Sequence, residues 1–250
     1  MIELKGQTAL ITGGGRGIGR AAAMLLARAG VDVALTYHTR AEDAESTAGE
    51  IRSLGRRAYV SGGDLGVPET SQTLATELRR EFGGLDIFVA NAGVWPADET
   101  PLAELSVERW RTTLHANLDS VFLSTREMLP LIRSGGRVVI VSSTAGQRGE
   151  AFHADYAATK GALISLTKSL ALECAPTITV NCVAPGWVDT ELSAPAFTTE
   201  NRERIRAGIP VGRIATAEDV AGPILFLCSA LARHITGEVL NVNGGSVLCG

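Results

Sequence analysis

Tyr156 and Lys160 stand four positions apart, and the chemistry of each depends on the other. On a helix this spacing puts both side chains on one face, about 6 Å apart along the axis. A free phenol has a pKa of about 10, and a neighbouring ammonium favours the phenolate and lowers that pKa. Such a phenol can exchange a proton with an oxygen whose carbon gains or loses a hydride. The pair therefore indicates acid–base chemistry on a carbonyl or alcohol, although an isolated Tyr–Lys pair is an ordinary feature of helix surfaces.

Ser143 directly follows a short apolar run, Arg137–Ser142, that predicts a buried strand. Ligands of open α/β folds bind at the carboxyl ends of the strands, so we expect Ser143 at such an edge. Its hydroxyl can donate a hydrogen bond to a substrate oxygen beside Tyr156. Ser142 should point to the opposite side, because side chains alternate along a strand.

Glycines cluster in residues 12–19, which read TGGGRGIG and follow another predicted strand. They let the backbone turn sharply and approach a pyrophosphate, which then sits at the positive N-terminal end of the next helix. The spacing of Gly13, Gly17 and Gly19 differs from the G-x-G-x-x-G of the commonest dinucleotide motif. A tight turn alone would also use glycines, but a strand before and a helix after favour cofactor binding.

The elements that must position these residues follow from an alternation of short Val-, Ile- and Ala-rich runs with longer segments of helical period. This alternation is typical of βαβ units, and it predicts an α/β fold with a single doubly wound parallel sheet of about seven strands, the Rossmann type. The predicted strands are Thr8–Thr12, Val31–Thr36, Ala58–Ser61, Ile87–Ala90, Arg137–Ser142, Ile178–Val183 and Val239–Val242. The predicted helices are Gly17–Ala29, Ala41–Leu54, Pro68–Phe82, Ser106–Asn117, Leu118–Ile132, Asp155–Glu173 and Ala217–Leu231.

The length of 250 residues predicts one domain, residues 1–250, because α/β folds of this size routinely have a single core. The connection from Gly186 to Arg213 contains no predicted strand and mixes Pro, Thr and charged residues. Such a loop in a compact domain is more often a cover over a site than a linker. We therefore expect a lid at about 187–213.

Composition and charge exclude several kinds of partner. The pI near 5.6 and net charge of -4 offer no basic face, so we expect no nucleic acid partner. The start of the chain lacks a signal-peptide pattern, and no apolar stretch approaches the roughly 20 residues of a spanning helix, so we expect a cytoplasmic protein without membrane contact. The cysteines and histidines lack metal-site spacing, which predicts free thiols and no bound metal. The cysteines are Cys174, Cys182, Cys228 and Cys249.

The motifs occur in an order that resembles the short-chain dehydrogenase/reductase family over essentially the whole chain. Besides the glycine segment and Tyr156-x-x-x-Lys160, the matching residues are Asp64-Leu65, Asn91-Ala92-Gly93, Asn117, Ser143, Pro185-Gly186 and Thr190. The resemblance implies an oxidoreductase that moves a hydride between a nicotinamide dinucleotide and a carbonyl or alcohol carbon. Within the family the chain resembles 3-oxoacyl-[acyl-carrier-protein] reductases, which would make it a ketone or 3-oxoacyl reductase. Of the two basic regions that dock the acidic carrier, one is present as Arg133, but the other, Cys174–Thr177, has no basic residue.

The resemblance also implies the roles of individual residues. The implied catalytic residues are Asn117, Ser143, Tyr156 and Lys160. Asn117 would hold a water that links Lys160 to solvent, or alternatively cap a helix. The implied cofactor-binding residues are Gly13, Gly15, Arg16, Gly17, Ile18, Gly19, His38, Arg40, Asp64, Leu65, Asn91, Ala92, Gly93, Tyr156, Lys160, Pro185, Gly186, Val188 and Thr190. Among them, Asp64 would accept from the adenine amino group unless it is only a turn former, and Val188 and Thr190 would meet the nicotinamide carboxamide.

NADP(H) is the expected cofactor, because no acid follows the second predicted strand until Glu42. NAD enzymes usually place Asp or Glu there to accept both ribose hydroxyls, and that carboxylate repels a 2′-phosphate. Arg16 and Arg40, with His38, can reach the same point, and arginine can hold a phosphate with two hydrogen bonds. The alternative is that both arginines are solvated surface residues.

Several classes of substrate and two other kinds of function are compatible with the sequence. We expect the substrate to contact Ser143, Ala145, His153, Tyr156 and Trp187, with Trp95 beside them. The equal alternative for Trp187 is that it packs the lid onto the body. An NAD-dependent alcohol, sugar or steroid dehydrogenase is an alternative. A non-catalytic cofactor-binding regulator is another, but it would not need Ser143, Tyr156 and Lys160 together. An epimerase or dehydratase would need a larger substrate-binding segment.

A homotetramer is the expected assembly. The helices near Leu118–Ile132 and Leu163–Leu172 carry more apolar residues than one sheet-facing stripe requires, and the family pairs such helices across subunits. The apolar tail Ser246–Cys249 offers another contact.

Overall fold

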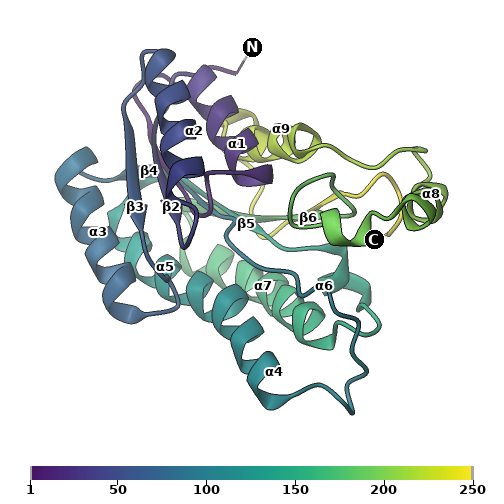
Figure 1. Cartoon of the computed structure of the whole chain (residues 1–250). Coiled ribbons are helices and arrows are strands. Elements are labelled where there is room, and N and C mark those ends of the chain that lie inside the picture. The colour runs from purple at the N-terminus through teal and green to yellow at the C-terminus, as the bar shows by residue number, and fades with distance from the viewer. Residues whose placement is uncertain (1, 249–250) are drawn as a thin grey trace.

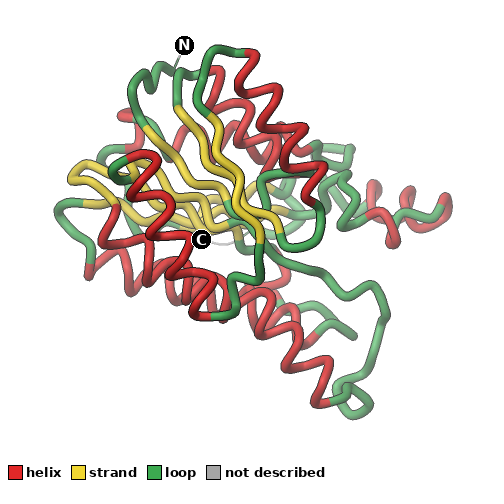
Figure 2. Tube along the Cα trace, turned by 60° about the vertical axis from the view of Figure 1, so that its left-hand side comes forward, coloured by secondary structure: helices red, strands yellow, loops and turns green. Residues whose placement is uncertain are grey.

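The computed structural model describes residues 2–248, and its strands form one parallel sheet. The strand order is β3-β2-β1-β4-β5-β6-β7, which is the predicted doubly wound arrangement (Figures 1 and 2). The strands are β1 (Thr8–Ile11), β2 (Asp32–Tyr37), β3 (Ala58–Gly62), β4 (Leu85–Ala90), β5 (Ile132–Val141), β6 (Ile178–Pro185) and β7 (Val239–Val242). All seven predicted strands are confirmed.

Helices cover both faces of the sheet. They are α1 (Gly17–Arg28), α2 (Ala41–Ser53), α3 (Pro68–Phe82), α4 (Val107–Leu114), α5 (Ser120–Met128), α6 (Thr144–Arg148), α7 (Ala154–Glu173), α8 (Thr199–Ala207) and α9 (Ala217–Leu227). Helices α1, α2 and α9 pack an Ala-, Val- and Ile-rich core against one face, while α3, α5 and α7 pack a second core against the other (Figure 1). The small side chains of α1, such as Ala22 and Ala23, let that helix approach the strands closely.

The predicted helix over Leu118–Ile132 is wrong at its carboxyl end. Helix α5 ends at Met128, a 3-10 turn covers Leu129–Leu131, and Ile132 already pairs with Leu85 in the sheet. Apolar residues continue through this segment, so the helical pattern does not reveal where the chain joins β5. At the other end, a π-helical turn over His115–Asp119 joins α4 to α5, where two separate helices were expected.

Two short helices, α6 and α8, were not predicted. Helix α6 begins after Ser143, whose hydroxyl accepts from the Ala145 N–H at 3.1 Å. Helix α8 lies within the predicted lid segment and is capped by Thr198, which accepts from the Asn201 N–H. Both are short and polar on most sides, so hydrophobic period does not mark them.

The strand order reverses between β1 and β4, so the loops that follow these two strands run to opposite sides. The crevice between them lies at the carboxyl edge of the sheet. Within residues 2–248, the structure has no helix with both the length and the apolar character to cross a membrane. The described part of the chain also contains no group of three or more His, Cys, Asp or Glu side chains placed to hold a metal ion.

Candidate active site

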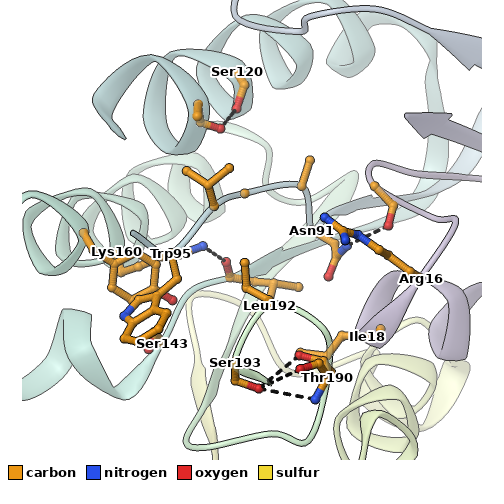
Figure 3. A pocket seen from close by; sticks show the side chains of 18 of the residues that line it. Arg16, Ile18, Asn91, Trp95, Ser120, Ser143, Lys160, Thr190, Leu192 and Ser193 are labelled. Carbon is orange, nitrogen blue, oxygen red and sulfur yellow. Dashed lines mark hydrogen bonds between the residues drawn. The ribbon is translucent and has the colours of Figure 1, made fainter. Parts of the chain in front are cut away.

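A cavity of about 560 Å³ lies at this carboxyl edge, and loops after several strands line it. The predicted cofactor- and substrate-binding residues line the cavity with two exceptions, Gly19 and His153. Of the four predicted catalytic residues, Ser143, Tyr156 and Lys160 line it and Asn117 does not. Figure 3 shows Trp95, Ser143 and Lys160 gathered at one end, away from Arg16.

The glycine loop forms the middle of the cavity wall. Its backbone is left-handed at Gly13 and Gly17, with φ of 64° and 51°. Gly19 lies beneath the loop, where a Cβ would come within 2.2 Å of the Gly13 carbonyl oxygen, so only glycine fits. Helix α1 begins at Gly17 and has no acidic residue in its first turn. The loop therefore fits an anionic pyrophosphate placed at the positive end of that helix.

Thr12 ties the glycine loop to the loop after β4. Its hydroxyl accepts from the N–H groups of Asn91 and Ala92, each at 2.9 Å, and the Asn91 amide donates to the Thr12 carbonyl at 2.9 Å. From the opposite wall, Thr190 in the lid approaches so closely that a Cβ on Gly17 would lie 3.4 Å from its methyl group. The glycine loop and the loop after β4 are thus fixed to each other, and the first part of the lid, at Thr190, lies across the crevice.

One end of the cavity carries cationic side chains. Residues 36–40, at and after the end of β2, line it together with Arg16. Arg40 Nη1 lies 4.0 Å from Asp43 Oδ2, and both side chains are exposed. Asp43, in the first turn of α2, lines this cavity and was missed in the sequence analysis, which looked for an acid only near the strand.

Asp64 lines the cavity and contacts His115, a second residue that the sequence analysis missed. His115 Nε2 lies 2.9 Å from Asp64 Oδ2, and the Gly66 N–H donates to Asp64 Oδ1 at 2.9 Å. Burial alone would raise the pKa of Asp64, but these hydrogen bonds outweigh burial and hold its pKa below the usual value. Asp64 is therefore an oriented, ionised acceptor, as binding of an adenine amino group requires.

Ser143, Tyr156 and Lys160 form the opposite end. Ser143 and Tyr156 both line this end, and Ser143 partly offsets the effect of burial on the pKa of the Tyr156 phenol. Lys160 Nζ donates to the Val141 carbonyl at 3.0 Å and lies 5.7 Å from the centre of the Tyr156 ring. The Ser142 hydroxyl donates to the Lys160 carbonyl at 2.7 Å. Of the two adjacent serines, only Ser143 is therefore available to a substrate oxygen.

Burial dominates the titration of this pair. It raises the pKa of Tyr156 to about 12 and lowers the pKa of Lys160 to about 8. The sequence argument expected the ammonium to lower the pKa of the phenol, but in the protein alone desolvation raises that pKa. The phenol is consequently protonated at neutral pH, which is the form that can donate a proton.

Asn117 is fully buried in the π-helical turn and does not reach the cavity surface. Its side-chain oxygen accepts from the Val94 N–H at 2.7 Å, and its amide donates to the Val94 carbonyl at 2.9 Å. The side chain therefore holds the loop after β4 in place. A role in relaying protons from Lys160 stays a prediction, and the side-chain amide is already committed to Val94.

Aromatic residues surround the catalytic end. Trp95 and Trp187 line the cavity with ring centres 5.8 Å apart, and Phe197 of the lid lies 5.7 Å from Trp187. His153, expected to line the pocket, instead stacks behind Trp95 with centres 4.8 Å apart and is 3% exposed. Glu150, which lines the cavity, was not predicted, because a single acid in a polar loop carries no sequence signal.

Comparisons with known proteins bear on the whole chain. The family described as "Enoyl-(Acyl carrier protein) reductase" matches residues 13–246. The 3-oxoacyl-[acyl-carrier-protein] reductases FabG of Aquifex aeolicus and Escherichia coli are 40% and 37% identical, each over 98% of both chains. A glucose/ribitol-type short-chain dehydrogenase/reductase structure from Brucella melitensis superposes with a TM-score of 0.93 at 33% identity, covering 99% of both chains. A short-chain dehydrogenase from Burkholderia cenocepacia in complex with NADP has a TM-score of 0.92 at 36% identity, covering 98% of this chain and 99% of that one.

Proposed function

The chain belongs to the short-chain dehydrogenase/reductase family of oxidoreductases, and we propose that it reduces a ketone or 3-oxoacyl carbonyl with NADPH, with Tyr156 as the acid. The observation that carries the proposal is the convergence of Ser143, Tyr156 and Lys160 at one end of a cavity whose middle is the glycine loop. A dinucleotide bound along that loop would bring its nicotinamide to the three side chains.

NADPH held by the glycine loop, Arg16 and Arg40 would supply a hydride to the carbonyl carbon. As the π electrons of the carbonyl move to oxygen, Tyr156 transfers its phenolic proton to that oxygen and the alcohol is complete. Ser143 donates a hydrogen bond to the same oxygen and holds it beside the phenol. Lys160 provides a positive charge that stabilises the phenolate until a proton from solvent restores it. The reverse reaction oxidises the alcohol, with the phenolate as base.

The choice of NADPH over NADH rests on the cationic end of the cavity. Arg16 and Arg40 line it on either side, and no acid stands between Tyr37 and Arg40. A 2′-phosphate would meet two guanidinium groups there. The carboxylate of Asp43, in the first turn of α2, offsets part of the positive charge of these arginines. The preference for NADPH over NADH should therefore be strong but not absolute.

We propose further that the substrate reaches the cavity without docking of a carrier protein, although the FabG relatives favour a 3-oxoacyl thioester as a second candidate. Arg133 lies at the opposite end of β5 from Ser143, and its guanidinium is engaged within the subunit. It bonds to Asp86 Oδ2 and to the Phe82 carbonyl, each at 2.9 Å. Residues 174–177 offer no second arginine.

A panel of ketones, 3-oxoacyl thioesters and alcohols, followed by the absorbance of the reduced cofactor, tests this function. We expect carbonyl-dependent oxidation of NADPH. A purified, folded protein that binds NADPH but turns over no member of the panel would favour a cofactor-binding regulator.

We also propose a homotetramer in the cytoplasm. The free thiols of Cys174, Cys182 and Cys228 suit a reducing compartment, while Cys249 lies outside the described residues. The apolar residues left exposed on α5 and α7 suit a subunit interface.

A further inference from the structure

We propose that Glu150 and the aromatic rings around it select a carbonyl substrate that carries a hydrogen-bond donor, either a hydroxyl or an ammonium group, and reject one that carries a carboxylate in the same place. The inference deepens the proposed function and rests on it, because it names the substrate class of the same cavity.

Glu150 sits between α6 and α7, in the loop that leads to Tyr156, and lines the cavity. Its side chain is 21% exposed. Burial raises the pKa of Glu150, and its charge in turn raises the pKa of Tyr156, so the carboxylate lies within electrostatic reach of the proposed acid. Because Glu150 and Tyr156 line the same cavity, a group attached to a carbonyl held by Tyr156 can extend toward Glu150.

The carboxylate keeps unused acceptor capacity. Its Oε1 lies 4.0 Å from His153 Nδ1, and among its neighbours His153, Trp95 and Arg148 favour its charged form. A carboxylate can accept about four hydrogen bonds. Because a half-desolvated carboxylate with few donors is costly, a ligand that brings a donor gains more here than it would at the surface.

The backbone of the loop is strained where it presents this group. Phe152 adopts a left-handed conformation with φ of 65°, although it is bulky and half exposed. The Phe152 carbonyl accepts from the Thr100 N–H at 3.0 Å, which pins the loop. Such outliers persist where the surroundings hold them, and they cluster at functional sites. The strained turn places Glu150 toward the cavity and His153 behind Trp95.

The rings supply the complementary surface. His153 stacks on Trp95 at an angle of 18°, which fixes the indole, and Trp187 meets Trp95 edge-on at 81°. Flat π faces beside a carboxylate suit an ammonium group or the apolar face of a hydroxylated ring.

Arg148 also lines the cavity and lowers the pKa of Glu150, but its side chain is exposed, so solvent screens its charge toward a ligand. The less exposed Glu150 is screened less. A substrate carboxylate at this depth would be repelled.

The test compares four aryl ketones on one ring that bear a methyl, hydroxymethyl, aminomethyl or carboxylate substituent, with NADPH as cofactor. For the unmodified protein we expect kcat/KM to favour the donor-bearing ketones over the carboxylate by about tenfold or more, equivalent to about 1.4 kcal/mol. In Glu150→Gln the ratio of kcat/KM for the aminomethyl ketone to kcat/KM for the methyl ketone should fall by about tenfold, since any effect on Tyr156 is shared by both ketones. If Glu150→Gln still prefers the hydroxymethyl ketone over the methyl ketone, a neutral hydrogen bond to residue 150 explains that preference. If Glu150→Gln no longer prefers the aminomethyl ketone, the negative charge of Glu150 explains the preference for the ammonium group.

Glu99→Gln is the matched control, because Glu99 is an exposed acid on a neighbouring loop and does not line the cavity. Affinity is read independently from quenching of tryptophan fluorescence in Tyr156→Phe with cofactor bound. Substituent preferences that are equal in Glu150→Gln and the unmodified protein overturn this inference alone. Absence of turnover for every ketone, with the binding preference intact, overturns the proposed reaction and leaves the selectivity of the site standing.

Discussion

Tyr156 lies in surroundings that oppose its ionisation, with 9% of the residue exposed and a pKa raised to about 12. Carbonyl reduction needs the protonated phenol, so in this direction the protein alone already provides the correct form. Alcohol oxidation needs the phenolate, which must be stabilised by the charge of Lys160 and by the positive ring of the oxidised cofactor. The two directions should therefore respond oppositely to pH.

Replacement of the acid and of its cation tests these roles. We expect Tyr156→Phe and Lys160→Ala each to reduce kcat by at least about 100-fold, because the first removes the proton donor and the second the stabilising charge. Circular dichroism should show an intact fold in both. A Tyr156→Phe protein that turns over a good substrate at nearly the unmodified rate would contradict the acid–base assignment.

The buried ammonium of Lys160 should make the site costly for stability. Its pKa of about 8 in the folded protein lies below the ordinary 10.5, which corresponds to about 3 kcal/mol of penalty below pH 8. Between these values the unfolded state binds more protons, so the penalty shrinks as pH rises, and above 10.5 neither state is charged. We expect Lys160→Met to melt at a higher Tm than the unmodified protein at pH 7, with a smaller gain at pH 10. A gain in Tm that does not depend on pH would exclude the buried charge of Lys160 as its cause. The titration of Tyr156 does not contribute to the difference, because both proteins contain this residue.

Arg16 and Arg40 should determine the preference for NADPH over NADH. Arg16→Ala and Arg40→Ala remove guanidinium groups from the end of the cavity that would meet a 2′-phosphate. We expect each to raise KM for NADPH by about tenfold and to change KM for NADH by less than about twofold. Steady-state kinetics with both cofactors measure this, and Arg79→Ala is the control, because Arg79 is exposed on α3 and does not line the cavity. Equal efficiency with NADH in the unmodified enzyme would reverse the assignment and leave the hydride-transfer proposal intact.

At the scale of elements, the position of Ser143 relative to Tyr156 depends on how closely α6 packs on α7. Gly146 makes that approach possible, because a Cβ there would lie 2.5 Å from the carbonyl carbon of Lys160 and 2.7 Å from the Gly161 nitrogen. Both atoms belong to backbone and cannot rotate away. The helix pair therefore acts as one rigid support for the catalytic end.

Gly146→Ala should separate these helices. We expect it to cost about 1–3 kcal/mol in the free energy of unfolding and to reduce kcat by about tenfold or more, since Ser143 moves away from the phenol. Gly222→Ala in α9 is the control, because a Cβ there meets nothing within 4 Å and should be neutral or slightly stabilising. Chemical denaturation and steady-state kinetics check both variants, and an active, stable Gly146→Ala would show that α6 can shift freely.

At the scale of the whole molecule, apolar side chains on α5 and α7 remain uncovered in a single chain. Phe122 is 51% exposed and Leu172 is 82% exposed, on helices that cover the same face of the sheet. Large apolar side chains that stay exposed on helices of one face suit a subunit interface. The tail residues 246–248 lie near the end of the described chain, and Cys249 lies beyond it.

We expect light scattering to give the mass of a tetramer at micromolar concentration. Phe122→Arg with Leu172→Arg should shift the protein toward smaller species, because two charges would be buried in the proposed interface. Leu102→Arg, equally exposed but on the loop before α4, is the control. A monomer for the unmodified chain would contradict the proposal.

The sequence by itself determined the order of strands and helices, because hydrophobic period and glycine placement are local properties. It also located the glycine loop, Ser143, Tyr156 and Lys160, whose chemistry follows from residue type and spacing. It did not locate the end of α5, since apolar residues continue from Met128 to Ile132, and nothing in the residue types of 115–119 (HANLD) marks the π-helical turn.

Only the tertiary structure decided how the side chains are used. Asn117 bonds to the backbone of Val94, and His153 lies behind Trp95, because contacts between distant segments set their directions. Burial likewise reversed the expected shift in the pKa of Tyr156, since desolvation depends on everything packed around the phenol. Glu150 became a candidate for substrate selection only when the strained turn at Phe152 placed it in the cavity.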